Sequence, residues 1–361
     1  MAQTFVQAPN QVGGLLTSHA VPTLGPEQSD HVLVRWLAAP ISRVDVLSLA
    51  GQYPAKPQHT LALALDDEEG EKRLPIPGFD GCGVVQASRS PLLAPGDLVL
   101  PQVLGLGTWR THAVLPATNL APLPPRIRAV DAALLRSGAL VAWLLLELEE
   151  APLRPGDYVM MSAGTSCVAQ FLVQLARRRG LHAVLVVRGR EPAPLAEVKE
   201  KLLGLGAMAV LTEEELVLEK GAQNPRQDLV GKVVLALDCV FGAVGQRMVE
   251  WLAPGGRFVL VGMLAGTDAG IEVRTEHLFY KQLSFVPFRS SEVLKRMGDE
   301  KTRQLMDKIA GLLTDGTLKA PEVHVVHWKQ RGKGELEAAL QQAVEMVQSG
   351  QVGYKKTVWL Y

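Results

Sequence analysis

The middle third of the chain alternates short apolar segments with longer helical ones. The apolar segments cover residues 158–161, 183–187, 209–211, 233–237 and 258–261. Helical spacing follows at 168–179, which ends at Gly180, and at 194–203, which ends at Gly204. Continuously apolar strands alternating with helices are typical of a parallel sheet covered on both faces, and the crossovers of such sheets are right-handed. The sequence therefore predicts an α/β fold with a doubly wound, Rossmann-type parallel sheet.

The segments on either side predict a second, β-rich domain. Residues 31–37 alternate in polarity like a strand, and a Pro-Gly-Asp turn leads into another at 95–100. The tail has an amphipathic helix at 335–347 and a strand-like end at 356–360. A terminal strand of this kind often returns to the first domain. We therefore expect a β-rich domain from 1–125, a Rossmann-type domain from 126–307, and a return segment from 308–361 that completes the first domain.

Charge and aromatic content argue against some functions. Lys and Arg number 37, as do Asp and Glu, and aromatic residues make up 5% of the chain. Nucleic acids and membrane surfaces both recruit excess positive charge, so neither is an expected partner. An acidic run at 66–73 is expected to be a solvated surface loop, with a partner-binding patch as the alternative.

The cysteines and the N-terminus bear on metals and location. Cys82, Cys167 and Cys239 are far apart, with no zinc-ligand spacing, so we expect no disulfide scaffold, no metal site and a reducing compartment. No apolar run reaches the roughly 18–20 residues of a membrane-spanning helix. No Lys or Arg precedes Arg35, so neither a transit peptide nor a secretory signal is visible.

The turn after the first buried strand is the expected cofactor site. Small residues at 162–166 lead into a helix, whose free N–H groups and dipole attract phosphate. Glycine is sparse in this turn, and a Cβ at Cys167 hinders close approach of the backbone. Cys167 is interpreted as a small packed residue rather than a redox thiol. The residues expected to contact the cofactor phosphates are Gly164, Thr165, Ser166, Cys167 and Val168.

Two arginines follow the second buried strand. A carboxylate at this place would bind the ribose hydroxyls of NAD, whereas arginines suit a 2′-phosphate. Arg188 and Arg190 therefore favour NADP over NAD, the alternative being that they are ordinary surface arginines.

Two aromatic residues of the first domain are candidate catalytic groups. Tyr53 lies in a Gly/Pro loop, where a phenol can stabilise an enolate, although a lone Tyr there is more often structural. Trp109 lies in the polar-aromatic stretch 105–113, where it can wall a cleft or pack behind a β-bulge, and the neighbouring Arg110 can hold a carboxylate.

Many of these segments resemble the mitochondrial trans-2-enoyl thioester reductases, zinc-free members of the medium-chain dehydrogenase/reductase superfamily. Within that superfamily, Gly-Thr-Trp-Arg-Thr at 107–111 and Thr-Glu-Glu-Glu-Leu at 212–216 are fairly specific to this family. The other matching runs lie at 37–41, 51–53, 105–106, 153–157, 186–188, 205–207, 211, 237–240 and 255–258.

The resemblance implies a GroES-like catalytic domain built from both ends of the chain. It also implies that NADPH gives a hydride to the β-carbon of an enoyl thioester, bound to coenzyme A or acyl carrier protein, in fatty-acid synthesis. A proton then reaches the α-carbon, and Tyr53 matches the family's catalytic tyrosine. Arg188 matches the arginine that reads the 2′-phosphate. By the same resemblance, Gly262 and Met263 are expected at the cofactor, Phe285 and Phe288 in the acyl pocket, and the protein as a mitochondrial homodimer.

Two departures from the family keep other functions open. Residues 138–142 are apolar where the family has Asn-Pro-x-Thr-Ala near the nicotinamide, and 284–287 lack the Trp of a Gly-Phe-Trp pocket segment. The first hypothesis is an active NADPH-dependent enoyl thioester reductase. The alternatives are a degenerate reductase acting as a structural or assembly subunit of a larger mitochondrial complex, and a quinone or enone oxidoreductase.

Overall fold

The computed structural model describes residues 1–7, 14–53, 55–64, 71–148, 152–218, 225–328, 333–350 and 353–361. They form two compact units, each described here by itself. Unit 1 contains Met1–Ser137, Arg303–Thr317 and Glu322–Tyr361, and unit 2 contains Gly138–Thr302 and Leu318–Pro321. Most of the acidic run, 66–70, lies outside the described residues.

Unit 2 is built around a six-stranded parallel sheet with the order β12-β11-β10-β13-β14-β15. Its strands are β10 (Tyr158–Met161), β11 (His182–Val187), β12 (Ala209–Thr212), β13 (Val233–Asp238), β14 (Leu252–Leu260) and β15 (Ser284–Pro287). Its helices are α3 (Val141–Leu145), α4 (Cys167–Arg178), α5 (Pro192–Leu205), α6 (Ala243–Glu250) and α7 (Ser290–Met297). The predicted Rossmann-type sheet is confirmed.

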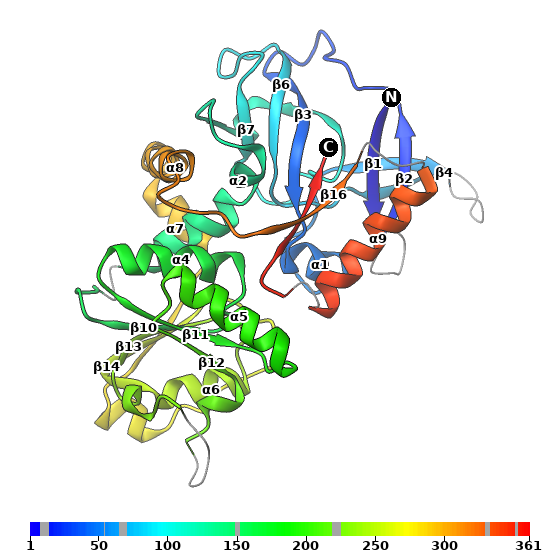
Figure 1. Cartoon of the computed structure of the whole chain (residues 1–361). Coiled ribbons are helices and arrows are strands. Elements are labelled where there is room, and N and C mark those ends of the chain that lie inside the picture. Colours follow the sequence, from blue (N-terminus) through cyan, green and yellow to red (C-terminus); the bar gives the residue numbers. More distant parts are fainter. Residues whose placement is uncertain are drawn as a thin grey trace. The chain divides into compact units, whose positions relative to one another are not determined.

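The central strands of this sheet are apolar because both of their faces are covered. Every residue of β12 and nearly every residue of β11 and β13 is buried. Figure 1 shows α4 and α5 on one face of the sheet and α6 on the other. Gly206 ends α5 in a left-handed conformation (φ 114°), which glycine adopts without steric cost.

Unit 1 is a β-rich fold with the seven-stranded sheet β16-β17-β3-β6-β7-β9, in which β8 also pairs with β3. These strands are β3 (His31–Pro40), β6 (Cys82–Ser88), β7 (Leu98–Pro101), β8 (His112–Pro116), β9 (Leu120–Leu123), β16 (Val323–His327) and β17 (Lys356–Leu360). Two hairpins, β1 (Ala2–Gln7) with β2 (Gly14–His19) and β4 (Thr60–Ala64) with β5 (Glu71–Pro75), complete the strands. Its helices are α1 (Arg43–Leu49), α2 (Ala129–Ala133) and α9 (Lys333–Ser349), while α8 (Asp299–Thr314) begins in unit 2 and ends in unit 1.

The end of the chain completes this sheet, as predicted. Strand β17 pairs antiparallel with β3, so that Val358 faces Pro40 (Figure 1). Helix α9 packs against α1, β2 and β16. A cluster containing Trp109, Trp328 and Trp359 forms the core beneath it.

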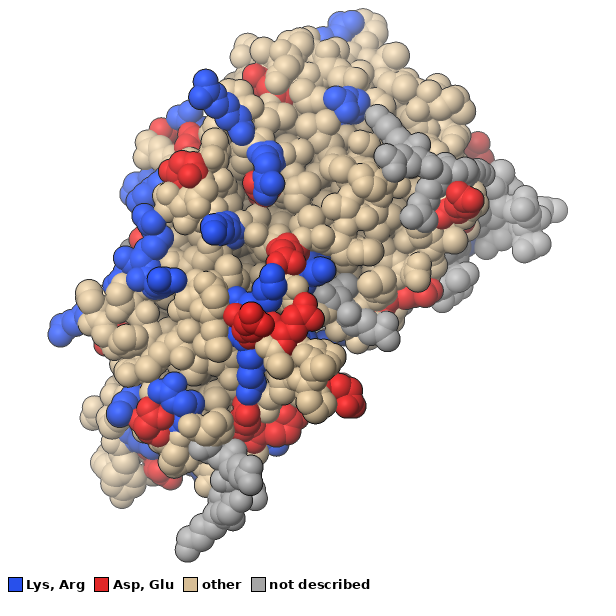
Figure 2. Space-filling model, in the orientation of Figure 1, with Lys and Arg blue, Asp and Glu red and all other residues tan. Residues whose placement is uncertain are grey.

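The surface shows charges of both signs. On the face drawn in Figure 2, basic and acidic side chains lie near one another over the left and lower parts, and the formal net charge of the chain is zero. Among the described residues, no helix has the length and apolarity needed to cross a membrane.

Candidate functional site

The sheet of unit 2 has a switch point between β10 and β13. From β10 the chain proceeds outward through β11 to β12, and it then returns to β13 and proceeds through β14 to β15. In open α/β sheets, ligands bind outside the carboxyl ends of the strands at such a point. Every predicted cofactor residue lies just beyond the carboxyl end of β10, β11 or β14.

The turn from β10 to α4 brings the backbone unusually close to β11. The Gly164 N–H donates to the Val186 carbonyl at 2.7 Å. A Cβ at Gly164 would lie 2.9 Å from the Leu185 Cβ and 3.0 Å from the Val186 oxygen, so only glycine fits without movement. Ala163 adopts φ 50°, a left-handed conformation that is rare for residues other than glycine. Although glycine is sparse in this turn, Gly164 stands at the position where the close approach to β11 requires it.

Helix α4 presents its N-terminus at this turn. The Ser166 side chain caps the helix by accepting the Ala169 N–H at 3.2 Å. Cys167 and Val168 are the first residues of the helix, where N–H groups lack partners within the helix and the dipole favours an anion. The turn and first helical residues, Gly164 to Val168, thus lie together in a geometry suited to a diphosphate.

The two predicted arginines lie together just beyond β11, which neighbours β10 in the sheet. Burial, together with the charge of Arg188, lowers the pKa of Arg190. The buried Nη1 of Arg190 has no hydrogen-bond partner among the described residues. Two adjacent guanidinium groups repel each other, and a phosphate anion between them would both relieve this repulsion and satisfy the orphaned donor. The residues present therefore fit a 2′-phosphorylated nucleotide.

A carboxylate lies near this pair. Glu213 follows β12, and burial and Glu214 raise the pKa of its carboxyl, while Arg188 and Arg247 lower it. Arg247 also donates to the Glu213 carbonyl at 2.7 Å. The carboxylate of Glu213 therefore interacts electrostatically with the guanidinium of Arg188.

The other predicted residues of unit 2 lie on the far side of the switch point. Gly262 and Met263 follow β14; the Gly262 N–H donates to the Asp238 carbonyl at 3.1 Å, and Met263 is 43% exposed. Phe285 lies in β15 with its ring 5.8 Å from that of Phe258, and Phe288, just after the strand, is buried. The pocket role of these two phenylalanines stays a prediction.

Tyr53 lies in unit 1, in the loop after α1. Its half-buried ring contacts the edge of the Phe79 ring, with 5.9 Å between centroids and an interplanar angle of 90°. Its hydroxyl makes no hydrogen bond with any described residue. The phenol is therefore held by its ring while its hydroxyl is left for another group.

A buried carboxylate fixes the backbone beneath Tyr53. Asp45 accepts the Phe79 N–H at 3.0 Å on one oxygen and the Ser42 N–H at 2.7 Å and hydroxyl at 2.5 Å on the other. Burial raises the pKa of Asp45 to about 6, against these hydrogen bonds, which lower it. Burial also raises the pKa of Asp80, whose carboxylate lies 3.9 Å from the Arg136 guanidinium.

Trp109 is a core residue of unit 1. Its side chain is 0% exposed, and its ring packs edge-on to Trp359 (5.3 Å) and tilted against Phe5 (5.8 Å). This placement favours the packed-Trp interpretation of the 105–113 stretch over a residue that touches substrate. The buried guanidinium of Arg110 donates to the Leu106 carbonyl at 3.0 Å, and burial lowers its pKa to about 10.

Several polar residues of these sites escaped the sequence-based reasoning. Ser162 and Asp238 are fully buried and hydrogen-bonded to each other at 2.6 Å, although 76 positions separate them. Asp238 stands at the end of a predicted strand, which was a usable signal, but nothing in the sequence pairs it with Ser162. Asp45 is part of a Ser-x-x-Asp capping pattern at 42–45, a recognisable helix start. Among the described residues, no three His, Cys, Asp or Glu side chains gather as metal ligands.

Comparison with known proteins places this chain in a family. Residues 167–310 match a sequence family described as zinc-binding dehydrogenase. The mitochondrial enoyl-[acyl-carrier-protein] reductase of Rattus norvegicus is 34% identical over 299 residues, 82% of this chain and 74% of the relative. The Homo sapiens enzyme of the same name is 32% identical over 299 residues, 82% of this chain and 75% of the relative.

Solved structures agree on the fold. The complex of Etr1p with NADP and crotonyl-CoA superposes with a TM-score of 0.80 at 22% identity, covering 100% of this chain and 99% of that one. A putative NADPH:quinone reductase from Bacillus thuringiensis superposes with a TM-score of 0.74 at 20% identity and the same coverage. Proteins of this fold have different functions, and it is the sequence relatives that identify the family. The chain belongs to the family of mitochondrial enoyl-[acyl-carrier-protein] reductases.

Proposed function

We propose that this chain is an NADPH-dependent reductase of trans-2-enoyl thioesters. The reaction is inferred from the family to which the chain belongs. The preference for NADPH is inferred from the arginine pair beyond β11, in which the buried Nη1 of Arg190 has no hydrogen-bond partner among the described residues. When bound, NADPH supplies the hydride for the β-carbon of the substrate.

The chain's own residues bind and orient the reactants. The N-terminus of α4 holds the diphosphate, and Arg188 and Arg190 hold the 2′-phosphate. The hydroxyl of Tyr53 donates a hydrogen bond to the thioester oxygen as negative charge develops there, or delivers the proton to the α-carbon. Asp45 and Phe79 keep the Tyr53 ring in place for this role.

Nucleotide titration tests the cofactor assignment. The wild type should bind NADPH more tightly than NADH, and Arg190→Ala should weaken NADPH binding at least tenfold while leaving NADH binding unchanged. Arg178→Ala is the matched control, because Arg178 is exposed at the opposite end of α4. Equal affinity for the two nucleotides would refute the choice of NADPH.

Turnover of enoyl thioesters tests the reaction and the role of Tyr53. Tyr53→Phe should lower kcat by about 10²–10³, the usual effect of removing one donor to a developing oxyanion. Tyr158→Phe is the control, since Tyr158 begins β10 and so lies at the opposite end of that strand from the predicted cofactor turn. Unchanged kcat in Tyr53→Phe would remove the phenol from the mechanism.

One observation favours the alternative of a non-catalytic subunit. Ala139, Leu140 and Ala142 are buried, so the segment that matches the polar stretch of the family offers no exposed polar side chain. A Cβ at Gly138 would lie 2.6 Å from the Cys167 sulfur, which shows how closely this segment packs on the cofactor turn. NADPH binding without turnover of any enoyl thioester would support that alternative, and turnover of quinones alone would support an enone or quinone reductase.

We also propose that the protein forms a homodimer through the β15 edge of the unit 2 sheet. Strand β15 is the last strand of the sheet as described, with an unpaired edge. Just before it, Leu278, Phe279 and Tyr280 are 56%, 73% and 75% exposed, a contiguous apolar patch of the kind that marks an interface.

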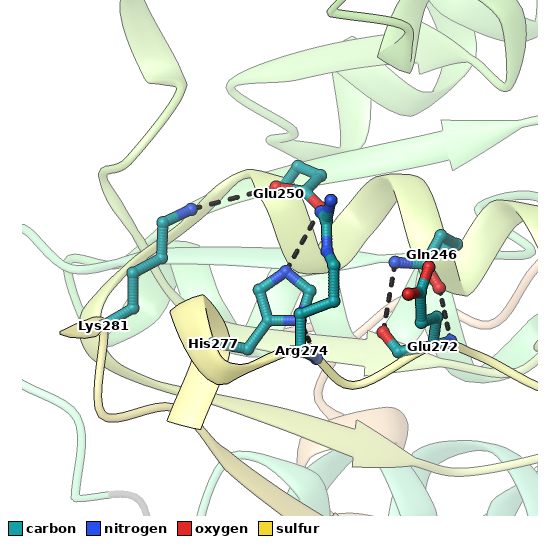
Figure 3. Close-up of polar contacts among 6 residues, drawn as sticks. All are labelled: Gln246, Glu250, Glu272, Arg274, His277 and Lys281. Carbon is teal, nitrogen blue, oxygen red and sulfur yellow. Dashed lines mark hydrogen bonds and ion pairs between the residues drawn. The ribbon is translucent and has the colours of Figure 1, made fainter. Parts of the chain in front are cut away.

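A polar clip holds the segment that carries this patch (Figure 3). Glu250, at the end of α6, accepts from Arg274 at 2.5 Å and from the Nε2 of buried His277 at 3.2 Å, and Lys281 lies 4.0 Å away. The Nδ1 of His277 accepts the Arg274 N–H, so Nε2 carries the proton. These contacts hold the segment in one conformation, so that its exposed apolar side chains can pack against a second copy of the chain.

Light scattering on the purified protein tests the dimer. Phe279→Ser should shift the mass toward that of a monomer, whereas Leu203→Ser, at an exposed leucine of α5, should not. A monomeric wild type would refute the proposal.

Substrate carrier and location follow the relatives. We propose that the chain accepts thioesters of acyl carrier protein and that it works in mitochondria, as the names of its relatives state for them. We propose that it also accepts thioesters of coenzyme A, since the similar structure of Etr1p is a complex with crotonyl-CoA. Comparing kcat/KM for the same enoyl group on the two carriers tests the first point. Fractionation of cells that express the full-length protein tests the second.

A further inference from the structure

We propose that Ser162 and Asp238, here called the couple, hold in position the loops that bind the nicotinamide half of the cofactor. The couple does not affect the binding of the adenosine half. This inference rests on the proposed binding of NADPH. The two side chains are fully buried and lie on opposite sides of the switch point: Ser162 directly follows β10, and Asp238 is the last residue of β13.

The couple makes four hydrogen bonds, two that join Ser162 to the end of β13 and the turn after it and two within that turn. The Ser162 hydroxyl donates to Asp238 Oδ1 at 2.6 Å and accepts the Cys239 N–H at 2.8 Å. The same Asp238 oxygen accepts the Val240 N–H at 2.9 Å, and Oδ2 accepts the Phe241 N–H at 3.0 Å. The carboxylate thereby fixes the whole turn after β13 to the start of the phosphate turn.

The turn after β13 carries strain that this carboxylate maintains. Phe241 adopts φ 70°, a left-handed conformation that a bulky side chain adopts only when its surroundings impose it. The donation of its N–H to Asp238 is one such constraint.

The constraint extends to the loop after β14, which includes the predicted cofactor residues Gly262 and Met263. The N–H groups of Val261 and Gly262 both donate to the Asp238 carbonyl, at 2.7 and 3.1 Å. Leu264 and Ala265 donate to the carbonyls of Cys239 and Val240. Three successive loops at the carboxyl edge are therefore fastened to one buried Ser–Asp pair.

The arrangement divides the cofactor site into two halves. Arg188 and Arg190 lie on the β11 side of the switch point, and the loops fastened by Asp238 lie on the β13 and β14 side. A dinucleotide bound across the switch point has its adenosine phosphate on the first side, so its nicotinamide reaches the second. Loosening the couple should therefore affect only ligands that contain the nicotinamide half.

A comparison of two ligands tests this directly. The variants are Ser162→Ala, which removes the bridging hydroxyl, and Asp238→Asn, whose amide cannot accept both sets of N–H groups. Each should weaken NADPH binding about tenfold, while the affinity for adenosine 2′-monophosphate, which has no 5′-phosphate to contact the turn after β10, changes less than about twofold. Arg190→Ala is the matched control and should weaken both ligands together.

The possible outcomes are distinct. Equal weakening of both ligands, or of neither, would show that the couple only stabilises unit 2 and would overturn the inference. If Asp238→Asn does not fold, Ser162→Ala gives the same ratio of affinities. A wild type that binds NADPH no more tightly than adenosine 2′-monophosphate would also overturn the inference. A wild type that binds neither ligand would overturn the proposed cofactor as well.

Discussion

Replacing Asp45 with asparagine should remove a pH dependence from the stability of unit 1. The Asp45 carboxyl is buried, and its pKa rises from 3.8 to about 6. A carboxyl whose pKa is raised by folding binds its proton more tightly in the folded state. Its stabilising contribution is therefore complete below pH 3.8 and is lost as the pH rises through about 6.

The size of the effect follows from the shift. A rise of about two pKa units corresponds to about 3 kcal/mol, of which about 2 kcal/mol is lost between pH 4.5 and pH 7. Asparagine does not titrate, so the wild type should gain about 2 kcal/mol relative to Asp45→Asn when the pH is lowered from 7 to 4.5. The substitution should also alter the packing of the Tyr53 ring, because Asp45 accepts the N–H of Phe79 and the Phe79 ring contacts that of Tyr53.

Urea denaturation followed by tryptophan fluorescence provides the assay, since Trp36, Trp109, Trp328 and Trp359 all lie in unit 1. The difference in free energy of unfolding between wild type and variant is measured at both pH values. Asp30→Asn is the control, because the Asp30 side chain is exposed in the folded protein and its difference should hardly change. A difference for Asp45→Asn that is the same at both pH values would refute the reasoning.

Two further changes separate packing from function. Trp109→Ala should lower the free energy of unfolding by about 3–5 kcal/mol in the same assay, because the side chain is fully buried among Phe5 and Trp359; full stability with lost turnover would instead place Trp109 at the substrate. Gly164→Ala should lower the melting temperature of unit 2 and weaken NADPH binding, because its Cβ would stand 2.9 Å from that of Leu185. Gly204→Ala, at a helical glycine with no atom near the added Cβ, should do neither.

The regular parts of the fold were predictable because they depend on local pattern. The strands at 158–161 and 356–360 lie where the apolar segments predicted them, and the helix predicted at 168–179 is observed at Cys167–Arg178. The return of the last strand to the first sheet was also predicted. The boundary expected at 125 stays a prediction; the first stretch of compact unit 1 runs to Ser137, inside a π-helical turn that no periodicity indicates.

The site was predictable where one motif contains it. The turn at 162–166 and the pair of arginines after β11 are each a short stretch of sequence, so their positions at the carboxyl ends of β10 and β11 followed from the strand order. The Ser162–Asp238 couple and the contact of Asp45 with Phe79 join residues distant in sequence. Such pairs are created by tertiary packing, and a single sequence carries no local trace of them.

The pairing of β17 with β3 also constrains how the chain folds as it leaves the ribosome. Most of unit 2 is one uninterrupted stretch, Gly138–Thr302, so its contacts form soon after its last strand is made. Strand β3, by contrast, waits about 300 residues for the partner that covers its end. Until then its edge is open to other chains, and at about 5–20 residues per second this exposure lasts roughly 15 to 60 seconds. Shortening the chain by its last few residues would make that exposure permanent.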